Sequence, residues 1–98
     1  MQALPMGKDW CFIVTGGELP SLGAVSAGGC TFAFAGHKED AVTHRMCEAF
    51  GKKLPMNVAV CCGIHLDNIS REEIADTLAL CDELAEKFIE SYFAEEQP

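Results

Sequence analysis

The sequence has few basic residues and no long apolar run. Seven Lys and Arg residues are outnumbered by fifteen Asp and Glu residues, so the formal net charge is -8. A surface with this charge repels the phosphates of nucleic acids and of anionic lipids. No apolar run approaches the roughly 20 residues that a membrane-spanning helix needs. We therefore expect no nucleic-acid partner and no membrane partner.

We also expect no secretory signal, because the opening MQALPMGKDW has no charged segment followed by an apolar one. Most of the cysteines lie inside apolar patterns, where a thiol behaves as a small hydrophobic group. The six cysteines are Cys11, Cys30, Cys47, Cys61, Cys62 and Cys81. We expect a reduced, cytoplasmic protein rather than a secreted domain held together by disulfides.

The composition fits one small folded domain. The chain has 98 residues, of which 49% are hydrophobic and 22% charged, and these fractions are typical of globular proteins. We expect a single domain over residues 1–98. Pro5 and Gly7 indicate an irregular lead-in over residues 1–8, followed by a folded core over residues 9–94.

Four apolar segments predict strands. The first stops at Gly16-Gly17, and the second and third are joined by Gly28-Gly29, a strong hairpin signal. The fourth follows the break at Leu54-Pro55. The predicted strands cover residues 10–15, 22–27, 30–35 and 57–64.

Two segments have helical periodicity. The first begins near Lys38, and Gly51 with the two following lysines is expected to close it. The second opens with Ser70 and Glu73 at capping-box spacing. An apolar stripe then runs to Tyr92, with carboxylates on the other side of the helix.

The element order is therefore strand, strand, strand, helix, strand, helix. It predicts an α/β fold of the α+β, two-layer type, with a mixed sheet of about four strands and both helices on one face. Because the strands are apolar throughout, the other face is expected to pack against a second copy, as a homodimer or higher symmetric oligomer.

The stretch AFAGHKED ends a strand at Gly36 and begins a helix. Backbone amides at a helix start, with the helix dipole, form a natural anion site, and His37 and Lys38 add side-chain donors. The alternative is that Glu39 and Asp40 already satisfy this helix end, while the two basic residues face solvent.

Two further loops carry candidate site residues. Gly16 and Gly17 let the backbone approach a ligand or adopt positive φ, although the surrounding TGGE pattern is neither a dinucleotide nor a P-loop motif. After the fourth strand, His65, Asp67 and Asn68 could converge with the other two loops. The alternative is purely structural. Gly16 and Gly17 then form a turn, Asp67 and Asn68 shape a second turn, and His65 lies on the surface.

Metal and catalytic sites are weaker hypotheses. Cys61 and Cys62 with His65 invite a zinc hypothesis, but adjacent strand residues point to opposite faces and no second CxxC pair exists. We favour structural thiols. His44 has no partner signature, and no nucleophile set is recognisable. Proton transfer by His65 and Asp67 is the one enzymatic alternative.

Taken together, TGG with a downstream Pro and GAV, then AGHKED, then GIHLDNIS before a long acidic helix, resemble the LpdD-like family over residues 10–92. These proteins accompany UbiD-type aromatic acid decarboxylases, such as gallate decarboxylase, as D subunits. The resemblance implies a non-enzymatic chaperone that carries prenylated flavin mononucleotide (FMN) to the decarboxylase. It also implies a fold similar to proteasome-assembly chaperones, which are two-layer α/β dimers.

The resemblance implies a cofactor site for prenylated FMN or FMN. His37 and Lys38 would hold the phosphate, and Gly16 and Gly17 would let the ring or ribityl chain approach the backbone. The family blocks fall on Gly16, Gly17, Gly36, His37, Lys38, Gly63, His65, Asp67 and Asn68. A structural assembly factor or accessory subunit without its own cofactor is the alternative.

Overall fold

The computed structural model describes residues 1–17, 21–34, 39–64 and 69–96. Five strands and two helices follow one another along these residues. They are β1 (Gln2–Met6), β2 (Asp9–Gly16), β3 (Ala24–Ala27), β4 (Cys30–Ala33), α1 (Asp40–Lys53), β5 (Val58–Ile64) and α2 (Arg71–Glu96).

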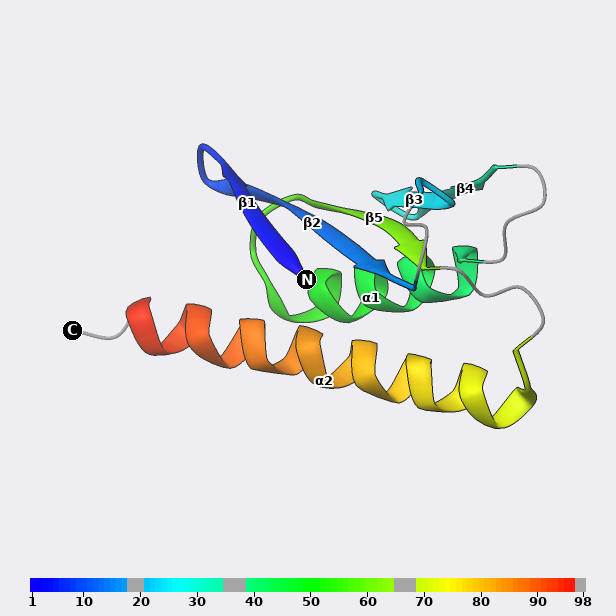
Figure 1. Cartoon of the computed structure of the whole chain (residues 1–98). Coiled ribbons are helices and arrows are strands. Elements are labelled where there is room, and N and C mark those ends of the chain that lie inside the picture. Colours follow the sequence, from blue (N-terminus) through cyan, green and yellow to red (C-terminus); the bar gives the residue numbers. More distant parts are fainter. Residues whose placement is uncertain (18–20, 35–38, 65–68, 97–98) are drawn as a thin grey trace.

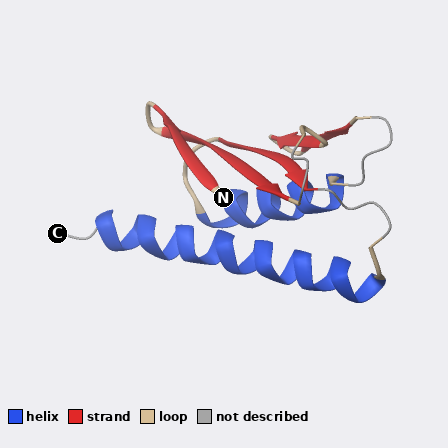
Figure 2. Ribbon diagram, viewed as in Figure 1, coloured by secondary structure: helices blue, strands red, loops and turns tan. Residues whose placement is uncertain are grey.

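The strands form one mixed sheet in the order β1-β2-β5-β3-β4. The central pair, β2 and β5, is parallel, and the neighbouring pairs are antiparallel. Both helices lie on one face of this sheet, in two layers (Figures 1 and 2). The predicted α+β class and the placement of both helices are therefore confirmed.

The sheet has one strand more than expected, because residues of the expected irregular lead-in form β1. This strand pairs antiparallel with β2, with Met6 opposite Asp9. The two-residue connection contains Gly7 at φ 64, a conformation that hairpin turns require. Pro5 is tolerated because β1 is an edge strand, where one side of the backbone has no strand partner.

The second hairpin joins β3 and β4 as the sequence predicted. Ala27 lies opposite Cys30, and both residues of the turn between them, Gly28 and Gly29, have positive φ, 55° and 85°. Two consecutive residues in this region are the requirement of a two-residue turn whose twist matches that of the strands. These two glycines therefore fix the register of the hairpin.

The first helix ends within the predicted segment of Gly51 and the two following lysines. It continues to Lys53, and the amide of Leu54 donates to the Phe50 carbonyl at 2.8 Å. The predicted start of α2 is confirmed. The Ser70 amide donates to Glu73 Oε1, and the Glu73 amide donates to Ser70 Oγ, each at 3.1 Å.

The core lies between the helices and the sheet. Phe12 of β2 stacks on Phe50 of α1 with ring centroids 4.0 Å apart, and Phe88 of α2 meets Phe12 edge-on at 4.7 Å. Arg45 adds a surface link between the helices, donating twice to Asp82 at 2.9 and 2.6 Å. The three rings tie β2 to both helices and so hold the sheet in place.

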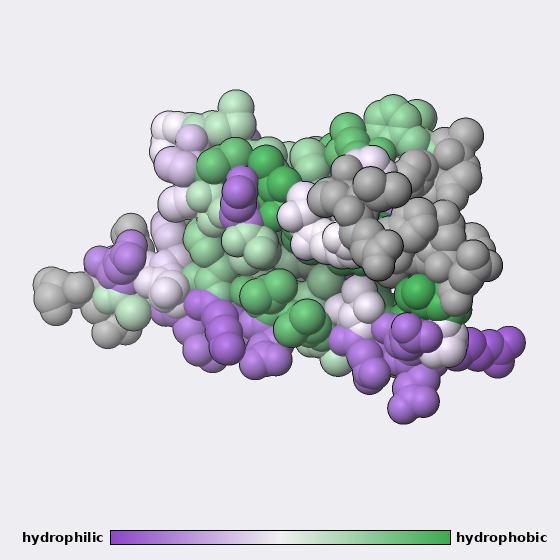
Figure 3. All heavy atoms as spheres, in the orientation of Figure 1, coloured by the Kyte–Doolittle hydropathy of each residue, from purple (hydrophilic) through white to green (hydrophobic). Residues whose placement is uncertain are grey.

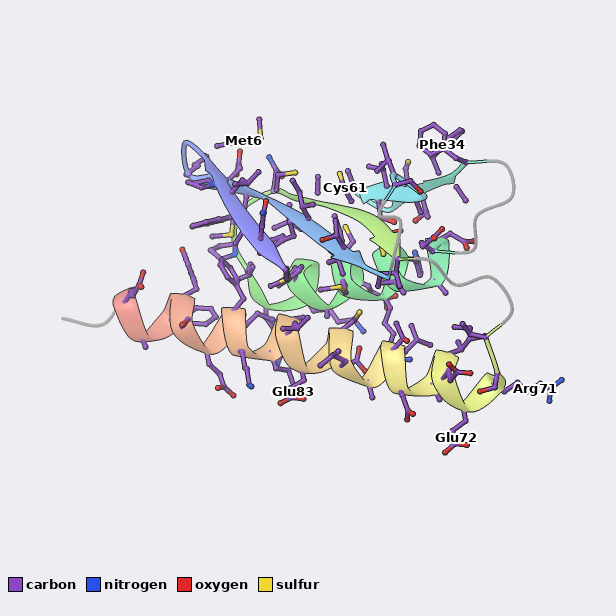
Figure 4. The ribbon with its side chains drawn as sticks, in the orientation of Figure 1. Met6, Phe34, Cys61, Arg71, Glu72 and Glu83 are labelled. Carbon is purple, nitrogen blue, oxygen red and sulfur yellow. The ribbon has the colours of Figure 1, made fainter. Side chains whose placement is uncertain are left out.

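The second helix is longer than the sheet beneath which it runs (Figure 1). Its 26 residues at about 1.5 Å each span about 39 Å, and the whole molecule measures 47 × 23 × 21 Å. Charged side chains, among them Arg71, Glu72 and Glu83, point away from the sheet (Figures 3 and 4). Within the described residues, no helix is long and apolar enough to cross a membrane.

Candidate functional site

Several strand ends meet at one edge of the sheet, which we call the carboxyl edge. Gly16, the last residue of β2, lies opposite Ile64, the last residue of β5. On the other side of β5, Ala24 at the start of β3 lies opposite both Cys62 and Ala33, the last residue of β4. The carboxyl ends of β2, β5 and β4 therefore lie along the same edge.

Both helices begin at this carboxyl edge (Figure 1). The carbonyl of Glu39 accepts hydrogen bonds from the amides of Val42 and Thr43 at 3.0 and 3.1 Å, which opens α1. The Glu39 side chain is buried and approaches Cys62, whose pKa it helps to raise. It is thus directed into the domain, and its carboxylate makes no capping hydrogen bond to the start of α1.

Of the predicted site residues, the structure describes Gly16 and Gly17. Gly16 ends β2, and a Cβ there would make ordinary contact with Ile64 at 3.7 Å. Gly17 has φ 81, so this position favours glycine for its backbone conformation. The other predicted residues, namely Gly36, His37, Lys38, His65, Asp67 and Asn68, lie outside the described residues.

The segment 21–23 passes directly over β5 near its end. The Gly23 amide donates to the Cys62 carbonyl at 2.8 Å, and the Phe34 amide donates to the Gly23 carbonyl at 2.9 Å. A Cβ on Gly63 would lie only 1.8 Å from the carbonyl oxygen of Ser21. Gly63 is therefore required by this close backbone approach, whatever it contributes to a ligand.

A small cavity of about 230 Å³ opens beside this crossing. It lies on the face of the sheet that the helices leave open, and its apolar lining includes Ile13, Leu22 and Cys61. The sequence did not single out Ile13 or Leu22, and it offered Cys61 only as part of the disfavoured zinc hypothesis. The available signal was strand alternation, because every second residue of β2 and β5 points away from the helices.

The neighbouring thiols Cys61 and Cys62 face opposite sides of the sheet. Burial raises the pKa of Cys62 to about 12. The pKa of Cys61 is also raised, first by burial and then by the adjacent Cys11 thiol. Both side chains are therefore protonated at neutral pH and are poor nucleophiles.

Metal ligands do not gather in the described part of the chain. No group of three or more His, Cys, Asp or Glu side chains there could hold a metal ion. His44, for which the sequence offered no partner, pairs with Glu48 at 3.4 Å and lies 3.5 Å from the Thr31 hydroxyl.

A family model described as the prenylated flavin chaperone LpdD-like domain matches residues 1–92. The chain belongs to this family. This confirms the resemblance found in the sequence and assigns the chain to a family of prenylated flavin chaperones. No curated protein matches the chain.

Membership of the LpdD-like family applies to nearly the whole described chain. The family description names a chaperone and no catalysed reaction. The family match starts at residue 1, so β1 is part of the LpdD-like domain. The described part of the carboxyl edge thus consists of glycine backbone and strand ends, with an apolar recess beside it.

Proposed function

We propose that the chain binds prenylated FMN, or FMN, at the carboxyl edge and delivers it to a UbiD-type decarboxylase in the cytoplasm. The observation that carries this proposal is the alignment of strand ends, Gly16 beside Ile64 and Ala33 two strands away. The loops that contain Gly17, His37 and His65 all start from this edge. We propose that all three loops contact one ligand.

The parts of the cofactor match the chemistry available at this edge. His37, Lys38 and amides near the start of α1 would hold the terminal phosphate, because a helix start favours an anion. His65, Asp67 and Asn68 would hydrogen-bond the ribityl chain. The apolar recess lined by Ile13, Leu22 and Cys61 would receive the flavin ring, since a ligand pocket needs an apolar wall with few polar groups.

A homodimer would complete this site. The face of the sheet opposite the helices carries exposed apolar side chains, including Leu4, Leu22 and Phe32, and the recess opens onto the same face (Figure 4 shows Met6, Cys61 and Phe34 on this side). A second copy packed across this face would cover the apolar surface and enclose the flavin ring. We therefore propose that two protomers pair through their open sheet faces.

The cofactor site is tested by a titration with oxidised and reduced flavin, followed by desalting. The chain is expected to retain the chromophore, and the double variant His37→Ala with Lys38→Ala is expected to bind at least tenfold more weakly. Each lost charge-assisted hydrogen bond costs about 1.5–3 kcal/mol. The matched control removes the same residue types elsewhere, in His44→Ala with Lys53→Ala. Unchanged spectra with the wild-type chain would refute cofactor binding.

The alternative is an assembly factor or accessory subunit without a cofactor of its own. It is favoured by the length of α2, which carries exposed Ile74, Leu80 and Phe93 among its carboxylates. On this alternative, the chain captures a UbiD-type decarboxylase subunit equally well with and without flavin. If the chain is a carrier, capture instead transfers the flavin to the decarboxylase.

A further inference from the structure

A second cavity, of about 640 Å³, lies at the other end of the sheet. It is an open recess bordered by the β3–β4 turn at Gly28 and Gly29, by α1 from His44 to Lys52 and by the segment leading into β5. The carboxyl edge is at the far end of these strands, because Ala27 lies opposite Ala59, near the start of β5. The volume is within the usual range of small-molecule pockets, about 300–1,000 Å³.

Gly51 on the wall of this cavity has no explanation within the chain. It lies inside α1, two residues before its end, where glycine destabilises a helix relative to alanine. Its φ is not in the left-handed region, and a Cβ built on it would meet no atom of the described residues within 4 Å. Neither backbone conformation nor internal packing therefore requires glycine. What the missing side chain does provide is room in the cavity.

The charges around the cavity balance one another. Glu48 pairs with Lys52 at 3.2 Å and with His44 at 3.4 Å, and all three residues line the cavity. Burial raises the pKa of the Cys47 thiol, so that its sulfur is uncharged at neutral pH. A charged ligand would have to compete with the existing pairs, in a chain whose net charge of -8 already disfavours anions. An uncharged ligand meets no such cost.

The side chains on the cavity wall favour aromatic groups. Cys47 and Met56 bring two sulfur atoms to the wall, and sulfur makes favourable contacts with aromatic rings. The imidazole of His44 adds a flat surface, with the Thr31 hydroxyl beside it at 3.5 Å. We propose that this cavity binds a neutral aromatic molecule of one or two fused rings, independently of the flavin site.

Indole is a suitable probe, because it is neutral and has two fused rings. In an amide NMR titration of the full chain, indole is expected to shift the signals of Gly28, Gly29 and Gly51 in a saturable way. Indole-3-carboxylate, its charged counterpart, is expected to bind at least tenfold more weakly. Shifts that do not saturate, or that fall on Val25 and Phe32 of the open sheet face, would overturn the proposal.

Substitution of Gly51 separates the cavity from the rest of the fold. Gly51→Leu fills the space and is expected to weaken indole binding at least tenfold, whereas Lys53→Leu in the same helical turn leaves it unchanged. Gly51→Ala is the control for misfolding of Gly51→Leu. It is expected to raise the melting temperature while weakening indole binding severalfold. If indole binds Gly51→Ala and Gly51→Leu as tightly as wild type, the cavity is not the site. Flavin retention is expected to be the same in all these variants.

Discussion

The two faces of the sheet are built from alternate residues of the same strands, yet the helices cover only one of them. On the covered face, Phe12 and Val60 are fully buried. On the open face, Leu4 is 43% exposed and Phe32 is 60% exposed. Both sets are apolar, so the difference lies in what covers them and not in their chemistry.

This comparison explains why the strands read as continuous apolar runs. In a sheet with one solvent-exposed face, apolar and polar residues alternate along each strand, whereas the strands of a sheet buried on both faces show no such alternation. Cys61, Ile13 and Val25 keep the open face apolar, although neither α1 nor α2 lies over it. The strands therefore have the apolar residues of a sheet that is covered on both faces, whereas the chain's own helices cover one face. The proposed second copy would cover the other.

The largest expected effect is the loss of a side chain from the covered face. Phe12 contacts the rings of both Phe50 and Phe88, so Phe12→Ala leaves a cavity at the centre of the core. The expected loss is about 3–5 kcal/mol of unfolding free energy, measured by urea denaturation at low protein concentration. Phe32→Ala on the open face is the control, and its expected loss under the same conditions is below about 1 kcal/mol. Equal losses would mean that the two faces do not differ in the monomer.

The next effect concerns association through the open face. Phe32→Glu places a charge on the exposed apolar surface and is expected to weaken self-association at least tenfold, because loss of an interface hot spot costs about 2 kcal/mol or more. Sedimentation velocity over a range of concentrations measures this change. Leu80→Glu introduces the same side chain on exposed α2 and is expected to leave the oligomer intact. A wild-type chain that stays monomeric would rule out the dimer.

Local signals in the sequence predicted the elements that depend on them. Ser70 and Glu73 form their reciprocal hydrogen bonds within four residues, and Gly28-Gly29 makes its turn without help from the rest of the chain. Gly51 and the two following lysines form the end of α1, as their local pattern predicted. Pro5 wrongly predicted an irregular segment in place of β1, since an edge strand tolerates proline.

The candidate site was less predictable because it depends on distant pairing. The register that brings Gly16 beside Ile64 joins residues 48 positions apart in the chain, and no local pattern specifies it. The cavity beside Gly51 likewise needs a hairpin, a helix and the lead-in to β5 to meet. Sequence motifs therefore identified candidate loops, whereas the common edge and the recess beside it required the assembled sheet.

The last prediction contrasts the neighbouring thiols Cys61 and Cys62, whose substitution is expected to change the pH dependence of stability and to have little effect at neutral pH. The Cys62 pKa is about 12 in the folded chain and about 9 in a free thiol, so the stability linked to this proton is complete below pH 9. Above pH 9 the unfolded chain releases the proton while the folded chain keeps it, and stability falls by up to about 1.4 kcal/mol per pH unit. Urea denaturation at pH 8 and pH 10.5 should therefore show a smaller loss in Cys62→Ala than in wild type. Because Cys61 is only half-buried on the open face, Cys61→Ala should change this pH dependence less, and identical behaviour of the two variants would contradict the assigned difference between the faces.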